Sequence, residues 1–141
     1  MDSGIVCAVD VGTGSARAGI LDGTGRMLGR AEQPIAMNRP KPDHAEHDSE
    51  DIWAAVCAAV RAARQNAGVA ADAVAGISFD ATCSLVVRDR QGGQLGVSPG
   101  GEARWDTLVW LDHRALAEAD ECTASRHRVL DYVGGVMSPE M

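Results

Sequence analysis

Apolar and polar residues alternate in short segments along most of the chain, and the segments differ in period. Three segments near the N-terminus, 4–10, 16–22 and 27–33, are apolar or alternating and are separated by turn residues. Short runs of this kind are typical of strands, and Asp22 followed by Gly23 is a strong hairpin signal. We therefore expect the chain to open with three antiparallel strands, with a glycine-rich turn joining the first two.

One segment has the period of a helix. Apolar residues recur at steps of three or four between Ile52 and Ala63, which places them on one face of a helix. Asp48 or Ser49 can cap its N-terminus, and Gly68 lies just past its end. This pattern predicts an amphipathic helix that packs against a core.

The other segments complete the expected fold. The polar, proline-rich stretch 34–47 is expected to be a loop. Strands are expected at 74–80, 84–89 and 107–112, and a helix is expected at 113–127. The order βββαβ, followed by further strand and helix, predicts an α/β fold with a mixed sheet and acidic residues at several strand ends.

The composition excludes several classes of protein. The chain has 141 residues and a net charge of −7, without a basic stripe, which disfavours a nucleic-acid partner. No apolar run reaches the roughly 18 residues of a membrane span. The N-terminus carries an acid where a signal peptide needs a base, and the four cysteines are far apart. We expect a cytoplasmic protein with no membrane partner.

The stretch VDVGTGSARAGILD, residues 9–22, suggests chemistry. It lacks the lysine of the Walker loop and the third glycine of the dinucleotide fingerprint. What remains is an acid-first turn that can present backbone N–H groups to phosphate, formed by Asp10, Gly12, Thr13, Gly14, Ser15 and Arg17. Asp10 would repel phosphate unless a divalent cation such as Mg²⁺ lies between them. An ordinary glycine-rich hairpin explains the same residues, and the pattern alone leaves both interpretations open.

Four stretches, in order along the chain, resemble the FGGY carbohydrate kinases of the actin/hexokinase superfamily. The glycine turn is similar to the family's first phosphate motif, and GISFDATCSLVVRD to its sugar-contacting strand and turn. LVWLDHRA resembles the Trp-x-Asp-x-Arg segment, and YVGGVMSPEM the stretch that follows it in pentulose kinases. The resemblance implies a ribonuclease H-like fold, a mixed sheet with flanking helices. It also implies transfer of the γ-phosphoryl of ATP to a sugar or polyol hydroxyl, with Mg²⁺ as the metal and a ketopentose such as D-ribulose as the substrate.

The resemblance also assigns roles to residues. Asp10 would help to hold Mg²⁺, and the rest of the turn would line the phosphate path, with Arg17 as the motif arginine or as a structural brace. The sugar would be contacted by Asp80, Thr82, Cys83, Trp110, Asp112, His113 and Arg114. Five alternatives stay open: Asp80 as a turn acid bonded to nearby amides, Cys83 as a small buried residue, Trp110 as a core tryptophan, Asp112 and Arg114 as partners of each other, and His113 as a solvent-facing residue.

A second polar cluster, DHAEHD at 43–48, contains two histidines and three acids. Its residues are adjacent in an expected loop rather than four apart on a helix, which is a poor arrangement for a metal site. We expect it to be a solvated entry to the helix.

Kinases of this family have two domains and are several times longer, with the catalytic base late in the first domain. Residues 1–141 are therefore expected to be the N-terminal portion of that domain, without the C-terminal ATP-binding domain. Such a piece is expected to be inactive alone and to self-associate into a homo-oligomer through uncovered strand edges. The alternatives are a non-catalytic nucleotide- or sugar-binding regulatory module of the same superfamily, and a plain binding domain.

Overall fold

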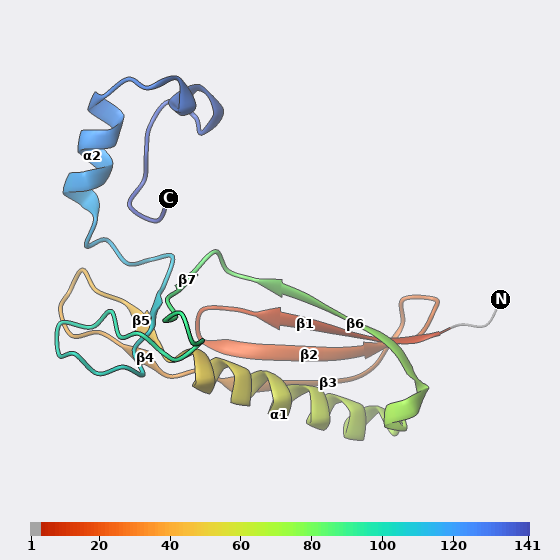
Figure 1. The fold of residues 1–141 in the computed structure, drawn as a ribbon. Helices are drawn as coiled ribbons and strands as arrows, with labels where there is room; N and C mark the ends of the chain where they lie inside the picture. The colour runs from red at the N-terminus through yellow and green to blue at the C-terminus, as the bar shows by residue number, and fades with distance from the viewer. Residues whose placement is uncertain (1–3) are drawn as a thin grey trace. The chain divides into compact units, whose positions relative to one another are not determined.

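The computed structural model describes residues 4–141, which form two compact units. The first unit contains residues 4–36 and 48–82, and the second contains 37–47 and 83–141 (Figure 1). Each unit is thus assembled from two separate stretches of the chain.

The first unit is built on a four-stranded sheet. Its strands are β1 (Ile5–Val11), β2 (Ser15–Leu21), β3 (Met27–Pro34) and β6 (Val74–Ala81), in the order β3-β2-β1-β6. The first three pair antiparallel, and β6 runs parallel to β1 (Figure 1). The mixed sheet and its three opening strands confirm the sequence prediction.

Helix α1 (Ser49–Ala67) covers one face of this sheet. The side chain of Asp48 accepts hydrogen bonds from the backbone at the helix start, and Gly68 ends the helix in the left-handed region with φ 66°. Alternate strand residues pack beneath the helix, and the buried core consists of Cys7, Val9, Ala16, Ala18, Ile20, Ile35, Ala55, Val56, Ala59 and Ala63. A short 3-10 helix, η1 (Ala71–Ala73), leads into β6.

Helix α1 and the sheet approach each other closely at Gly29 in β3. A Cβ atom at this position would lie 2.5 Å from the backbone nitrogen of Ala67 and 2.7 Å from the carbonyl oxygen of Ala63. Only glycine permits this approach, since both obstacles are backbone atoms.

The second unit contains a small antiparallel sheet of two-residue strands. These are β4 (Met37–Asn38), β5 (Glu46–His47), β7 (Leu85–Val86) and β8 (Thr107–Leu108), in the order β4-β5-β8-β7. Helix α2 (Leu116–Ala124) and the 3-10 helix η2 (Arg128–Tyr132) follow. Across residues 4–141, no helix has both the length and the apolar character that crossing a membrane requires.

Several expected boundaries in this unit are wrong. The stretch 34–47 is not only a loop, because β4 and β5 form there by pairing with each other and with β8. The strands expected at 84–89 and 107–112 shrink to two residues each, and the helix expected at 113–127 is shorter than predicted. The helix begins later than predicted for a local reason. The Asp112 carboxylate accepts the backbone N–H of Arg114, and this bends the chain before a helix can begin.

The expectation of a solvated helix entry at 43–48 holds for Asp43, which is exposed, and for Asp48, which caps α1, but it is wrong for residues 44–47. Glu46 is fully buried, and His44 and His47 are buried beside it. The Glu46 carboxylate accepts hydrogen bonds from Asn38 Nδ2 at 2.8 Å and from Arg114 Nη2 at 2.7 Å. A distant arginine therefore makes the burial of this acid tolerable.

Candidate functional site

The glycine-rich turn is a tight connection between β1 and β2. The N–H of Gly12 donates to the carbonyl of Ser15 at 3.0 Å, which leaves Thr13 and Gly14 as the two loop residues. The carbonyl of Gly14 accepts the N–H of Ile35 at 3.0 Å. The turn is therefore fixed at both its base and its tip.

The two glycines of the turn differ in their surroundings. A Cβ atom at Gly12 would lie 3.3 Å from Arg17 Nη2 and 3.5 Å from the carbonyl oxygen of Ser15, so this position is tight. A Cβ atom at Gly14 would meet no described atom within 4 Å, and the φ of Gly14 is not positive. Neither backbone conformation nor packing within residues 4–141 requires a glycine at position 14.

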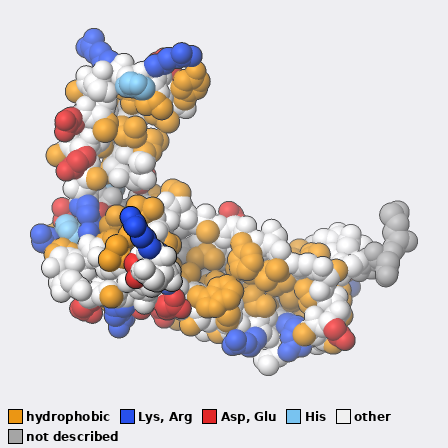
Figure 2. Space-filling model, in the orientation of Figure 1, with side chains coloured by type: hydrophobic (Ala, Val, Ile, Leu, Met, Phe, Trp, Pro, Cys, Tyr) orange, Lys and Arg blue, Asp and Glu red, His pale blue; other side chains and the backbone are white. Residues whose placement is uncertain are grey.

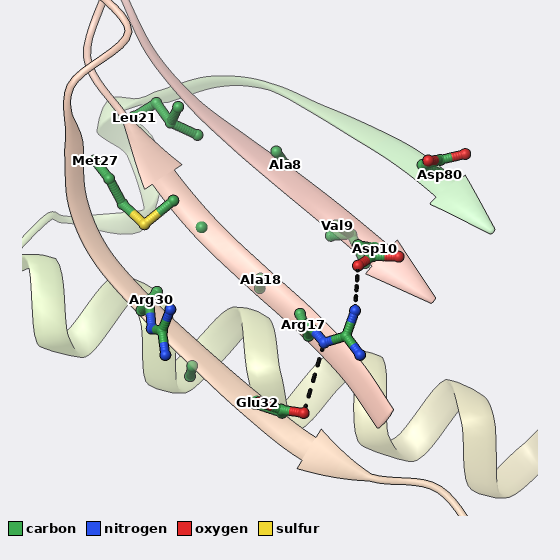
Figure 3. Close-up of a pocket in the computed structure, with 12 residues that line it drawn as sticks. Ala8, Val9, Asp10, Arg17, Ala18, Leu21, Met27, Arg30, Glu32 and Asp80 are labelled. Atoms are coloured by element: carbon green, nitrogen blue, oxygen red, sulfur yellow. Dashed lines mark hydrogen bonds and ion pairs between the residues drawn. The ribbon is translucent and has the colours of Figure 1, made fainter. Parts of the chain in front are cut away.

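A row of charged side chains crosses the sheet next to this turn. The strand register aligns Asp80 of β6, Asp10 of β1, Arg17 of β2 and Glu32 of β3, all on the face opposite α1 (Figure 3). Arg17 Nη1 lies 2.7 Å from Asp10 Oδ2, and Arg17 Nε lies 3.5 Å from Glu32 Oε1. The hydrogen bond and charge of Asp10 raise the pKa of Arg17. Arg17 thus braces the sheet from the second strand.

The Ser15 hydroxyl belongs to the same network. Ser15 is buried, and its Oγ donates to Glu32 Oε1 at 2.6 Å. This hydrogen bond, together with Arg17, holds the pKa of the Glu32 carboxyl below its ordinary value. Because its proton points to Glu32, the Ser15 hydroxyl offers lone pairs rather than a donor to any further group.

Asp10 and Asp80 are neighbours at the carboxyl ends of the two parallel strands. They line a hollow of about 380 Å³ together with Arg17, Arg30, Glu32 and apolar residues of β1, β2 and β3 (Figure 3). Oδ1 of Asp80 accepts the N–H of Ala81 at 3.0 Å. Carboxyl ends of parallel strands are the usual place for ligands in sheets of this class.

The second unit contains a separate pocket of about 320 Å³. Four of the expected sugar-binding residues line it, namely Cys83, Trp110, Asp112 and Arg114. Ser84, Leu85, Pro139, Glu140 and Met141 contribute to the same wall. Trp110 is 43% exposed, so its ring is not a core side chain. The exposed position of Cys83 likewise contradicts the alternative that it is a small buried residue.

Asp112 and Arg114 are bonded to each other in this pocket. Arg114 Nε and Nη2 donate to the two carboxylate oxygens of Asp112 at 2.8 and 2.7 Å. The same carboxylate accepts the N–H of Ala45 at 2.7 Å, and Arg114 Nη1 donates to the carbonyl of Val97 at 2.9 Å. Burial raises the pKa of Asp112, but the hydrogen bonds from Arg114 and Ala45 outweigh it and leave the pKa below the ordinary value. The two charges are committed to the wall of the pocket.

The remaining expected residues lie elsewhere. His113 is exposed, does not line the pocket, and donates its N–H to the carbonyl of Asp43. Thr82 extends the parallel pairing of the first unit through its N–H to the carbonyl of Val11. Within residues 4–141, no group of three or more His, Cys, Asp or Glu side chains is arranged to hold a metal ion.

Two acids that the sequence patterns do not single out, Glu32 and Glu140, also lie at these sites. Glu32 could be found only by knowing the register of β2 against β3, which places it opposite Arg17. Glu140 lies within the quoted stretch YVGGVMSPEM, but nothing in the local pattern indicates that it reaches a pocket with Trp110.

Comparison with known proteins is consistent across sequence and structure. The N-terminal domain of the FGGY family of carbohydrate kinases matches residues 5–137. The human FGGY carbohydrate kinase domain-containing protein is 47% identical over 133 residues, covering 94% of this chain and 24% of that protein. The D-ribulokinase of Saccharomyces cerevisiae is 44% identical over 135 residues, which cover 94% of this chain and 19% of that protein. The chain thus spans about a quarter or less of the length of these relatives.

Solved structures show the same fold. A "xyloylose kinase" from Brucella ovis superposes with a TM-score of 0.83 at 22% identity, over 97% of this chain and 27% of that one. The xylulose kinase from Rhodospirillum rubrum superposes with a TM-score of 0.69 at 22% identity, over 86% of this chain and 23% of that one. At 22% identity, these two similarities show the fold alone.

Proposed function

Because the chain belongs to the FGGY family of carbohydrate kinases, we propose that it supplies the sugar pocket and one side of the phosphate site of a cytoplasmic pentulose kinase. The reaction is transfer of the γ-phosphoryl of ATP to a hydroxyl of a ketopentose, with D-ribulose as the preferred substrate. Identity of 44% to a D-ribulokinase supports this choice. The catalytic base and the adenosine pocket lie outside residues 1–141, so the 141-residue chain alone is expected to be inactive.

The observation that carries the proposal is the convergence of two separate motifs on one pocket. Cys83 comes from the first sugar-contacting motif and Trp110 from the second, and both line the 320 Å³ pocket. The face of an indole ring suits the C–H face of a sugar. Asp112 and Arg114 hold the wall in shape through their bonds to each other, to Ala45 and to Val97.

On the phosphate side, the tip of the turn suits close approach of an anion. Gly14 has open space in place of a side chain, so phosphate oxygens can come near the backbone N–H groups of the turn. Ser15 acts by anchoring the turn to Glu32 rather than by donating to phosphate. Gly12 keeps the backbone clear of the Arg17 guanidinium.

The residues next to the turn fit a hydrated Mg²⁺. Asp10 and Asp80 are adjacent carboxylates on parallel strands, and Oδ1 of Asp10 accepts no hydrogen bond from residues 4–141. Two neighbouring carboxylates repel each other, and Mg²⁺ typically binds through one or two carboxylates while keeping several waters. Bound there, the ion would offset the charge of the phosphates.

Ligand protection tests the proposal. D-ribulose is expected to raise the melting temperature of the 141-residue chain, because it binds the folded pocket and not the unfolded chain. Protection by ATP with Mg²⁺ but not by any pentulose or polyol would favour a non-catalytic nucleotide-binding module instead. Protection by neither would favour a plain binding domain.

The first unit also supports the expected self-association. Trp53 of α1 and Ile77 and Phe79 of β6 are each more than half exposed and line one shallow hollow. Figure 2 shows apolar side chains gathered over these elements. An edge strand with an apolar face is a surface for pairing with a second copy. Sedimentation of the 141-residue chain is expected to show concentration-dependent dimers that Phe79→Lys abolishes.

A further inference from the structure

The sugar pocket of the second unit has fewer available polar groups than its lining suggests. Asp112 accepts from Ala45 and Arg114, and Arg114 is divided among Asp112, Glu46 and the carbonyl of Val97. The Oγ of Ser84 accepts the N–H of Trp110 at 3.3 Å. These groups build the wall and have little capacity left for the hydroxyls of a sugar.

Glu140 differs from them. It lines the pocket, it is exposed, and its carboxylate takes part in no hydrogen bond or ion pair with residues 4–141. The positive charge of Arg114 is already matched by Asp112 and Glu46, so it does not neutralise Glu140.

We propose that Glu140 is the hydroxyl acceptor of this pocket and selects neutral polyhydroxy substrates over sugar acids. The inference rests on the proposed function, since it names the group that recognises the sugar in the same pocket. An ionised carboxylate only accepts hydrogen bonds, and its two oxygens can accept from two hydroxyls at once. Hydrogen bonds to an ionised acceptor are about twice as strong as neutral ones.

The charge of Glu140 also sets what the pocket rejects. A carboxylated sugar would bring a second negative charge into a pocket whose only cation, among the described lining residues, is paired with two acids. Like charges at short range raise the free energy of the bound state. Trp110 can accept the apolar face of either ligand, so discrimination falls to Glu140.

Nuclear magnetic resonance of the 141-residue chain tests this directly. The chain has three tryptophans, so the indole N–H signals of Trp53 and Trp105 serve as internal references for that of Trp110. D-ribulose and the aldonic acid D-ribonate are titrated into the native chain, Glu140→Gln and Glu118→Gln. Glu118 is an exposed acid of α2 outside the pocket and provides the matched control.

D-ribulose is expected to shift the Trp110 signal of the native chain, and Glu140→Gln to weaken its binding about tenfold. The preference for D-ribulose over D-ribonate should shrink in Glu140→Gln and persist in Glu118→Gln. If Glu140→Gln binds both ligands as the native chain does, the role of Glu140 is overturned while the sugar pocket stands. If D-ribulose leaves Trp110 unshifted in the native chain, the pocket assignment fails and the inference fails with it.

Discussion

Arg114 donates from Nη2 to Oε1 of Glu46 at 2.7 Å, although the two residues are 68 positions apart in the chain. Glu46 lies in β5 and is fully buried, whereas Arg114 follows β8, the strand that pairs with β5. The contact therefore joins the two stretches from which the second unit is assembled, and it holds one wall of the proposed sugar pocket.

Arg114→Ala is expected to destabilise the second unit by about 3–5 kcal/mol, because it leaves two buried carboxylates, Glu46 and Asp112, without their cation. Urea unfolding measures the change. Arg128→Ala, at an exposed arginine of η2, is the matched control and should stay within about 0.5 kcal/mol of the native chain. Equal urea midpoints for Arg114→Ala and Arg128→Ala would show that the bonds of Arg114 to Glu46 and Asp112 contribute nothing to the free energy of unfolding.

Stability is expected to fall in acid through Asp112. Its pKa is lower in the folded chain than in the unfolded chain, where the ordinary value is about 3.9. The unfolded state therefore binds more protons in this range, and the contribution of Asp112 is present above about pH 4 and lost as the pH falls through the folded pKa. Melting temperatures between about pH 2 and pH 7 should drop less steeply in Asp112→Asn than in the native chain, and parallel curves would contradict this.

Two glycine substitutions are expected to behave oppositely. Gly29→Ala drives a Cβ atom into the backbone of α1 at Ala67 and should lower the free energy of unfolding by about 1–3 kcal/mol or more.

Gly14→Ala meets open space at an ordinary φ and should leave the free energy of unfolding within about 0.5 kcal/mol of native. Because the proposed phosphate path passes the tip of the turn, Gly14→Ala should nonetheless weaken the protection by ATP with Mg²⁺ of a protein that carries this chain at the full length of its relatives. Unchanged protection would leave the turn a purely structural hairpin.

Features set by neighbouring residues could be predicted from the sequence. The cap at Asp48, the left-handed glycine after α1 and the opening hairpins depend on contacts a few residues apart, and all three form as expected. The Glu32–Ser15 pair depends on the register of two strands, and the Glu46–Arg114 pair brings together residues that are far apart in the chain. No local sequence pattern encodes either pair. For the same reason, the local pattern at 43–48 predicts a solvated stretch, whereas a distant arginine allows Glu46 to be buried.

We propose that this chain provides the sugar pocket and the phosphate turn of a pentulose kinase. Transfer of label from γ-labelled ATP to D-ribulose, by a protein that carries this chain at the full length of its relatives, tests it most directly. We expect transfer in the native protein and a loss of about a hundredfold or more in Asp10→Asn, since charge neutralisation at the phosphates is worth several kcal/mol. No transfer to D-ribulose or to any other neutral pentulose or polyol, or an unaffected rate in Asp10→Asn, would contradict the account.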